Sequence, residues 1–275
     1  MRKIFCFTKF LLLFLFLSCS NDDGTSNNNG LSDNVNFKKL ASIKSEKSPQ
    51  FKDTLIYDND RLILAYFPKC SGTLHKFEYL NSSKVINRSE ILGVNSIKEN
   101  IDGKEQDKFS LSYDKNGLKE ELELKREDTS GGGVTFEQAL GRNVYFYNED
   151  GILTSIVYTE GDYTSTTSIN YANGKISKIT VGENTYTFEF DNYPNPLYEL
   201  SKKYGFIRLE TCGGFDFFRD ELIFKNNVVK ASKNNEVYFV ATYEYDGDGY
   251  PIKRNYTNTS FTITATDTEV FTYLK

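Results

Sequence analysis

The chain contains few of the side chains on which many catalytic and metal sites depend. Its 275 residues include no tryptophan, one methionine, one histidine and four cysteines. A single histidine excludes sites that need two or more, such as most histidine-based zinc centres. His75 lies at the start of an expected strand in "GTLHKFEY", where we expect an ordinary surface histidine. The sequence therefore predicts no catalytic residue, no metal ligand and no cofactor.

The chain also lacks a run of basic residues. Lys and Arg number 33 against 38 Asp and Glu, which gives a formal net charge of −5. Residues 1–18 contain three basic residues and no acid, so the chain from Cys19 onward carries 30 − 38 = −8. Because nucleic-acid binding depends on Lys and Arg that neutralise phosphates, this balance excludes nucleic acid as an expected partner.

The N-terminal apolar run, Phe10 to Leu17, is too short to cross a membrane. As a helix it would rise about 12 Å, whereas the hydrocarbon core of a bilayer is about 30 Å thick. Arg2 and Lys3 precede the run and a small residue, Ser18, follows it. Positive charge, a short apolar core and a small residue before the cut are typical of a secretory signal peptide, which we expect over residues 1–18.

The end of that run, Phe16-Leu17-Ser18-Cys19, resembles the bacterial lipobox. The resemblance implies a lipoprotein signal peptide that is cut after Ser18, with a diacylglycerol on the Cys19 thiol. Cys19 would then tie the chain to outer-membrane lipid through buried acyl chains such as palmitate. The motif usually has Leu where this chain has Phe16. The alternative is an ordinary signal peptide that happens to end at a cysteine.

Residues 19–36 are rich in Ser, Asn, Asp and Gly, and we expect them to form a flexible tether. Asp22 and Asp23 resemble the acidic surface-export signal of lipoproteins from Bacteroidetes-type bacteria. The resemblance implies transfer to the outer leaflet, and the alternative is a solvated linker that contains two acids by chance. Cys70 and Cys212 are the other two cysteines left after residue 18. They could form a disulfide in an oxidising compartment or stay as two buried thiols.

From residue 37 to residue 275 the chain repeats one pattern: a β-type run that ends in Tyr, a polar turn and another β-type run. The turn closes on Asn-Gly or Asp-Gly, and Gly supplies the positive φ that such turns require. "LIFKNNVVKAS" is a weaker example without glycine. The stronger examples are "LSYDKNGLKEELEL", "VYFYNEDGILTSIVY", "INYANGKISKITV" and "YEYDGDGYPIKRNY". The Asp-Gly-Asp-Gly stretch in the last of these fits a turn better than a calcium loop.

Apolar and polar residues alternate between these turns, as in Phe109, Leu111 and Tyr113. One apolar and one polar face per strand predict an antiparallel sheet with one solvated side. The fold class that follows is all-β with one short helix, a long meander of hairpins curled into an open barrel or roll. The helix is expected in "PLYELSKKYG", with Pro196 in its first turn and Gly205 at its end.

The turns of this domain resemble the YD repeats of Rhs-type proteins. "FDNYPNPLYEL", followed by "LIFKNNVVKASKNNEVYFVATYEYDGDGYPIKR", resembles Bacteroidetes outer-membrane lipoproteins of unknown function with a porin-like β-meander. The resemblance covers roughly residues 105–275. It implies a fold and a location, and it carries over no catalytic residue.

These observations favour a lipid-anchored cell-surface protein that binds or scaffolds a glycan or a protein without catalysis. One alternative is a glycan hydrolase that uses two carboxylates in a cleft of the roll. The other is a structural lipoprotein that faces the periplasm. The three hypotheses differ in where the chain resides and in whether its carboxylates meet a substrate.

Overall fold

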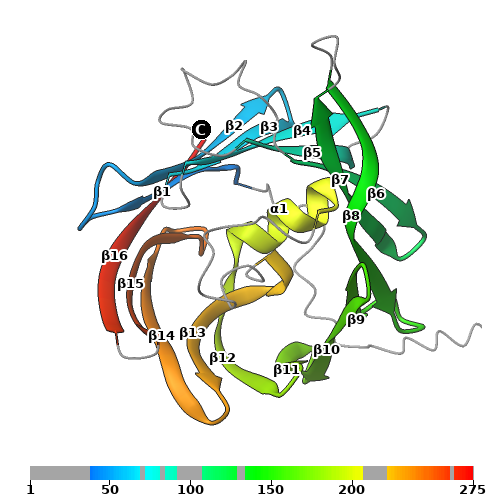
Figure 1. Cartoon of the computed structure of the whole chain (residues 1–275). Coiled ribbons are helices and arrows are strands. Elements are labelled where there is room, and N and C mark those ends of the chain that lie inside the picture. Colours follow the sequence, from blue (N-terminus) through cyan, green and yellow to red (C-terminus); the bar gives the residue numbers. More distant parts are fainter. Residues whose placement is uncertain are drawn as a thin grey trace, which may run out of the picture. The chain divides into compact units, whose positions relative to one another are not determined.

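A computed structural model of the chain describes residues 38–68, 72–80, 84–91, 107–128, 134–206, 222–260 and 263–274. They lie in a compact unit that spans Phe37–Lys275. Within them sixteen strands form one antiparallel sheet (Figure 1). The strands are β1 (Leu40–Ser45), β2 (Lys52–Asp58), β3 (Arg61–Phe67), β4 (Thr73–Tyr79), β5 (Val85–Ile91), β6 (Asp107–Asp114), β7 (Gly117–Asp128), β8 (Val134–Tyr147), β9 (Leu153–Glu160), β10 (Tyr163–Ala172), β11 (Lys175–Val181), β12 (Asn184–Pro194), β13 (Asn226–Lys233), β14 (Glu236–Tyr245), β15 (Pro251–Ser260) and β16 (Ile263–Tyr273).

The sheet closes into a barrel because the last strand pairs with the first. Each strand pairs with its neighbours in chain order, and β16 pairs with β1 through Leu40 opposite Tyr273 and Ile43 opposite Phe271. The predicted all-β meander is therefore confirmed. The sequence left open whether the sheet closes, and closure removes the two exposed strand edges that an open roll would have.

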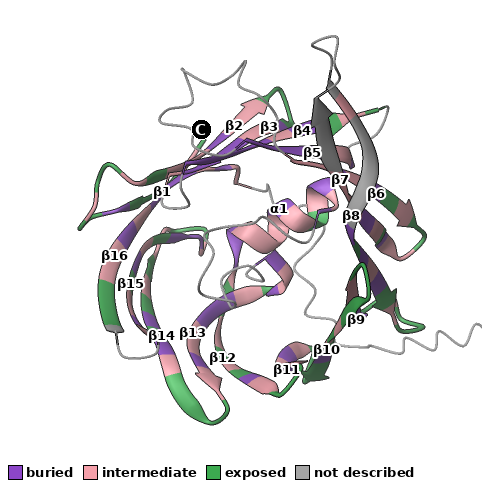
Figure 2. Cartoon of the chain, in the orientation of Figure 1, coloured by how far each residue is buried: buried purple, intermediate pink, exposed green. Residues whose placement is uncertain are grey.

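The buried positions, coloured purple along the strands in Figure 2, are mostly apolar, and most of these apolar residues form one core. Ile169, Ile179 and Phe239, for example, belong to one continuous buried cluster. The residues that alternate with these inward positions are polar and exposed over much of the outer surface. They include Thr164, Thr166, Ser168 and Asn170 on β10, Thr187 and Glu189 on β12, and Thr242 and Glu244 on β14.

Three neighbouring strands depart from the predicted single wet face. Tyr66 on β3, Leu74 on β4 and Ile91 on β5 form a second buried cluster. Leu74 alternates with the inward-facing His75 and Phe77, so this cluster lies on the outer side of the sheet. The sequence carries the reason, because Leu62 to Phe67 is a continuous apolar run, which is typical of strands that are buried on both faces.

Among the described residues there is one α-helix, α1 (Pro196–Tyr204), which follows β12 in the chain and lies inside the barrel ring (Figure 1). The Asn195 side chain accepts a hydrogen bond from the Leu197 N–H, and Pro196 occupies the first turn. Gly205 ends the helix at φ 85°, and its N–H donates to the Ser201 carbonyl. Each of these features matches a start or stop signal in the sequence, and the predicted helix is confirmed.

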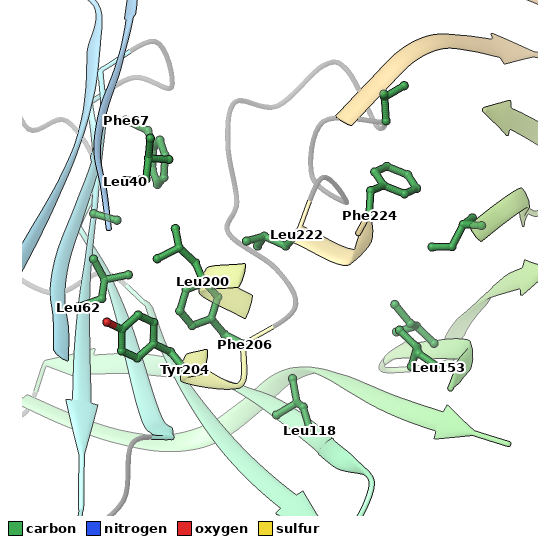
Figure 3. Packing of buried hydrophobic residues seen from close by; sticks show 14 of the residues in the cluster. Leu40, Leu62, Phe67, Leu118, Leu153, Leu200, Tyr204, Phe206, Leu222 and Phe224 are labelled. Carbon is green, nitrogen blue, oxygen red and sulfur yellow. The ribbon is translucent and has the colours of Figure 1, made fainter. Parts of the chain in front are cut away.

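Side chains of α1 and of the segment after it pack into the apolar interior (Figure 3). Leu200 and Tyr204 are fully buried together with Leu62 on β3. The Tyr204 ring centroid lies 6.5 Å from that of Tyr57 and 6.2 Å from that of Tyr79. Phe206 stacks on Phe77 at 5.1 Å. The C-terminal end of α1 therefore covers the inner face of β2–β4.

The Gly turns form as the sequence predicts, with one exception among the weaker patterns. Gly117, Gly151, Gly174 and Gly249 all have positive φ. The prediction of a hairpin turn in "LIFKNNVVKAS" is wrong, because residues 222–225 form no strand and Asn226 and Asn227 open β13. The left-handed asparagines of this region are Asn234 and Asn235, which join β13 to β14.

Candidate functional site at the helix end of the barrel

The residues predicted to anchor, export or cross-link the chain lie outside the described residues. This holds for Cys19, for Asp22 and Asp23, and for Cys70 and Cys212. Their predicted roles stay predictions.

His75 was expected on the surface, and the structure shows that this expectation is wrong. Its side chain is fully buried on the inner face of β4, between the rings of Phe67 and Phe77. The Nδ1 atom lies 3.3 Å from Glu90 Oε1 and 3.3 Å from Arg88 NH1. His75 follows Leu74 in a strand that is buried on both faces. The alternation of apolar and polar residues therefore could not show whether the His75 side chain is exposed.

Arg88 is the centre of this buried charged cluster. Its guanidinium donates to Glu121 Oε1 at 2.9 Å, and the Tyr145 hydroxyl donates to Glu121 Oε2 at 2.9 Å. Arg88 also lies over the Phe109 ring at 4.0 Å. Both Glu121 oxygens are thus occupied by partners from β5 and β8, and the cluster has the arrangement of a structural network that neutralises buried charge. Nothing in this arrangement favours the hydrolase alternative.

A second set of polar contacts runs around the end of the barrel that holds α1. Seven tyrosines at the ends of even-numbered strands donate their hydroxyls to main-chain carbonyls at the starts of the preceding odd-numbered strands. The O···O distances are 2.5–3.0 Å. The pairs are Tyr57 to Leu40, Tyr79 to Leu62, Tyr113 to Val85, Tyr147 to Leu118, Tyr171 to Leu153, Tyr243 to Val228 and Tyr273 to Pro251. We call this set the tyrosine ladder.

On β2, β4, β6, β8 and β10 the ladder explains why the sequence repeats a tyrosine just before its turns; on β14 the ladder member is Tyr243, and the tyrosine before the turn, Tyr245, donates to Asp191. On the first five of these strands the tyrosine is the last inward residue of its strand, and its ring spans to the neighbouring strand beside the turn. Its hydroxyl donates a hydrogen bond to a main-chain carbonyl at the end of the barrel, where strand pairing stops. Burial raises the pKa of Tyr171 to about 12 and raises the pKa values of Tyr57, Tyr79 and Tyr113 further. These hydroxyls therefore remain neutral donors at physiological pH.

The ladder lacks a hydroxyl at β12. Lys178 on β11 is opposite Thr187 on β12, and extending this register by three residues places Phe190 opposite Lys175. In each of the seven hairpins above, the same register places the tyrosine opposite the residue that precedes its carbonyl acceptor. The residue that follows Lys175, and that would be the acceptor here, is Ile176. Phe190 has no hydroxyl to donate. The sequence signal for this gap is the Phe in "TFEFDNYP", where the other hairpins have Tyr.

A pocket of about 430 Å³ lies beside this gap, within the size range of small-molecule sites. Its wall combines Phe190 and Ile176 at the gap with the ladder tyrosines Tyr147 and Tyr171. The helix α1 contributes Tyr198, Ser201 and Lys202 on the opposite side. The pocket is therefore built from four hairpins and the helix that lies among them.

The charged groups in the pocket wall are lysines: Lys84, Lys175, Lys202 and Lys225. Lys84 donates to the Lys202 carbonyl at 2.9 Å, and burial lowers its pKa. Lys175 donates to the Asp191 carbonyl at 2.8 Å. Among the residues that the structure describes, the wall includes no carboxylate. The pocket is thus a positive site on an acidic protein, and it is the candidate functional site.

The Asp-Gly-Asp-Gly stretch forms a turn. One oxygen of Asp246 accepts the N–H groups of Asp248 and Tyr250, each at 3.0 Å. Lys38 forms ion pairs with both Asp246 and Asp248. The carboxylates thus close the turn and hold Lys38. Within the described ranges, no group of three or more His, Cys, Asp or Glu side chains could hold a metal ion.

Comparisons with known proteins return structures but no family. No family model matches the chain, and no curated protein matches it. A porin-like protein from Bacteroides uniformis is 11% identical, with 86% of this chain and 98% of that chain covered at a TM-score of 0.43. A porin-like protein from Bacteroides vulgatus is 13% identical, with 86% and 99% covered at a TM-score of 0.38. In the described part of the chain, no helix is long and apolar enough to cross a bilayer.

Proposed function

We propose that the chain is a lipid-anchored cell-surface protein whose barrel is a non-enzymatic binding module, with the lysine- and tyrosine-lined pocket as its ligand site. The observation that carries this proposal is the coincidence of the pocket with the gap in the tyrosine ladder. Seven hairpins close their barrel end with a hydroxyl, and the eighth leaves space beside Lys175 and Phe190.

The distribution of polarity supports a barrel that stands in water. Membrane-spanning barrels present an apolar band outward and polar side chains inward. This barrel has the opposite arrangement on β10, β12 and β14, with apolar residues inside and Thr, Ser, Asn and Glu outside. Attachment to the membrane would then depend on the acyl chains at Cys19, as the lipobox-like Phe16–Cys19 suggests.

The acids beside Cys19 support export to the outer leaflet, and they can be tested on intact cells. Protease added outside the cells should cut the native protein and should leave an Asp22→Ala/Asp23→Ala variant protected. An Asp33→Ala variant is the matched control, since it removes an acid from the same segment at a distance from Cys19, and it should be cut like the native protein. Protection of the native protein would contradict surface exposure and favour the periplasm-facing alternative.

The binding role is tested on the purified chain from Cys19 onward, without its lipid. We expect binding to one or more members of a glycan and protein panel, and no hydrolysis of the glycans that bind. Loss of binding on substitution of pocket residues would locate the site. Turnover of a glycan, abolished by alanine at two carboxylates, would contradict the non-enzymatic proposal.

A further inference from the structure

The lysines of the pocket differ from the other lysines near this barrel end. Lys38 lies 2.7 Å from Asp246 Oδ2 and Lys39 lies 2.6 Å from Asp60 Oδ1. By contrast, Lys175, Lys202 and Lys225 form no ion pair within 4.0 Å with any carboxylate in the described residues. Within the described part of the chain, the charges of these three lysines are therefore not paired as those of Lys38 and Lys39 are.

An acid on α1 lies near enough to moderate this charge. Glu199 on α1 is half-buried and interacts electrostatically with Lys202 and Lys225, while its burial raises its pKa. It is not part of the pocket wall. Lys175, Lys202 and Lys225 keep their positive charge without an ion pair in the described residues, and like charges held together in this way favour a bound anion.

The remaining wall has the chemistry that recognises a sugar ring. Tyr147 and Tyr171 commit their hydroxyls to the ladder and leave ring carbons facing the pocket, beside Phe190. Asn116, Asn226 and Ser201 supply amide and hydroxyl groups that can exchange hydrogen bonds with sugar hydroxyls. Aromatic surface together with a few placed polar groups fixes a ligand that has one apolar face and a polar edge.

We propose that this pocket binds an anionic saccharide, one that carries carboxylate or sulfate groups on its sugar rings. The proposal rests on the proposed function, of which it names the ligand class. The lysines bind the acidic groups, the tyrosine rings pack against the sugar, and the amides hold its hydroxyls. Because the charges are partly exposed, the affinity falls as ionic strength rises.

The test uses calorimetric titration of the purified chain from Cys19 onward with two pairs of probes. The first pair is trigalacturonate and its trimethyl ester, which has the same rings without charge. The second pair is a sulfated galactose disaccharide and its unsulfated form. We expect at least one acidic probe to bind at least 10-fold more tightly than its neutral partner. The same titrations with inorganic sulfate show whether an anion without a sugar suffices.

Substitutions locate the binding. A Lys175→Gln/Lys225→Gln variant should bind the acidic probe about 10-fold more weakly. A Lys52→Gln/Lys178→Gln variant removes two exposed lysines from the outer faces of β2 and β11 and should bind like the native chain. Far-ultraviolet circular dichroism and the urea midpoint of each variant check that it is folded.

Three outcomes would overturn the ligand class. They are equal affinity for charged and neutral probes, equal affinity of the two double variants, and binding of inorganic sulfate as tight as that of the acidic probes. Absence of binding to all four saccharides would also overturn it. None of these results decides the proposed function, which the protease experiment and the wider panel test separately. Binding of a protein or a neutral glycan in that panel would keep the binding role and replace the ligand class.

Discussion

The helix end of the barrel has two sectors that use the same hairpin repeat differently. In the first, over β1–β6, the helix covers the tyrosine ladder: Tyr204 packs between Tyr57 and Tyr79, and Gly205 approaches Tyr113. In the second, over β7–β12, the ladder is interrupted at Phe190 and a pocket lies beside this gap. The first sector is a packed core and the second is a candidate binding site.

The difference between the sectors comes from a few side chains. The hairpins supply similar turns and similar buried aliphatic residues in both. What changes is the direction of α1, whose C-terminal end reaches β2–β4, and the replacement of a ladder tyrosine by Phe190. The candidate site thus lies where one hairpin departs from the repeated pattern and where α1 does not cover the barrel end.

The largest expected effect is on the buried charged cluster around Arg88, which belongs to the packed side of this comparison. Arg88→Met removes the cation that Glu121 and Glu90 face and leaves buried carboxylates without it, at a cost of about 3–5 kcal/mol in the free energy of unfolding. Lys230→Met is the control, because its ion pair with Glu189 is exposed and should change stability by less than about 0.5 kcal/mol. Urea unfolding measures both. Equal effects would show that the cluster is not a buried ion network.

Two glycines with positive φ compare the close packing at the end of α1 with the open space at the β10–β11 turn. A Cβ at Gly205 would lie 2.7 Å from Lys84 Cδ and 2.8 Å from Tyr113 Cε1, whereas a Cβ at Gly174 would meet nothing within 4 Å. Both have positive φ, which costs an L-residue about 1–2 kcal/mol. Gly205→Ala should therefore destabilise the chain by about 3 kcal/mol and Gly174→Ala by about 1 kcal/mol. Similar urea midpoints would contradict the packing difference.

Alkaline pH should weaken the covered sector first. Burial, and then Asp60, raises the pKa of Tyr204 to about 12 from its ordinary value of 10. The folded state then holds this proton more tightly than the unfolded state, so its contribution is complete below pH 10 and is lost between pH 10 and 12. Tyr204→Phe should flatten the fall in stability over this range. Tyr171→Phe should flatten it less, since Tyr171 is 37% exposed and its charge is better screened.

A smaller effect concerns the helix hydroxyls at neutral pH. Tyr204 donates to the Asp60 carbonyl at 2.6 Å, and Tyr204→Phe should cost about 1 kcal/mol. Tyr198, on the pocket side of the same helix, makes no hydroxyl hydrogen bond within the described residues, and Tyr198→Phe should change stability by less than about 0.5 kcal/mol. The urea midpoints of the two variants measure this difference. Equal losses would indicate that the helix packs equally on both sectors.

The sequence predicts much of this scaffold because its signals are local. Asn-Gly and Asp-Gly turns, strand alternation and the Asn195, Pro196 and Gly205 signals of α1 each depend on residues next to one another. Closure does not, because the pairing of β1 with β16 joins residues more than 200 positions apart. The repeated tyrosine was visible in the sequence, but its partner carbonyl lies on a neighbouring strand and becomes evident only from the register.

The candidate site was missed for the same reason. Lys84, Lys175 and Lys225 come from three separate segments, Lys202 comes from the helix, and no motif connects them in the sequence. His75 was placed wrongly because alternation assigns faces only where one face is polar, and β4 is buried on both. A Phe at the ladder position of β12 was the one signal that could have indicated the gap.

The most direct test completes the ladder at the gap. Phe190→Tyr adds a hydroxyl directed toward the Ile176 carbonyl and into the pocket, with one atom added to a wall of the site. We expect the acidic probe that the native chain binds to bind this variant at least about 10-fold more weakly, a loss of about 1.4 kcal/mol, while the urea midpoint stays unchanged or rises. Native affinity in a folded Phe190→Tyr variant would contradict the account that the gap in the tyrosine ladder forms the ligand site.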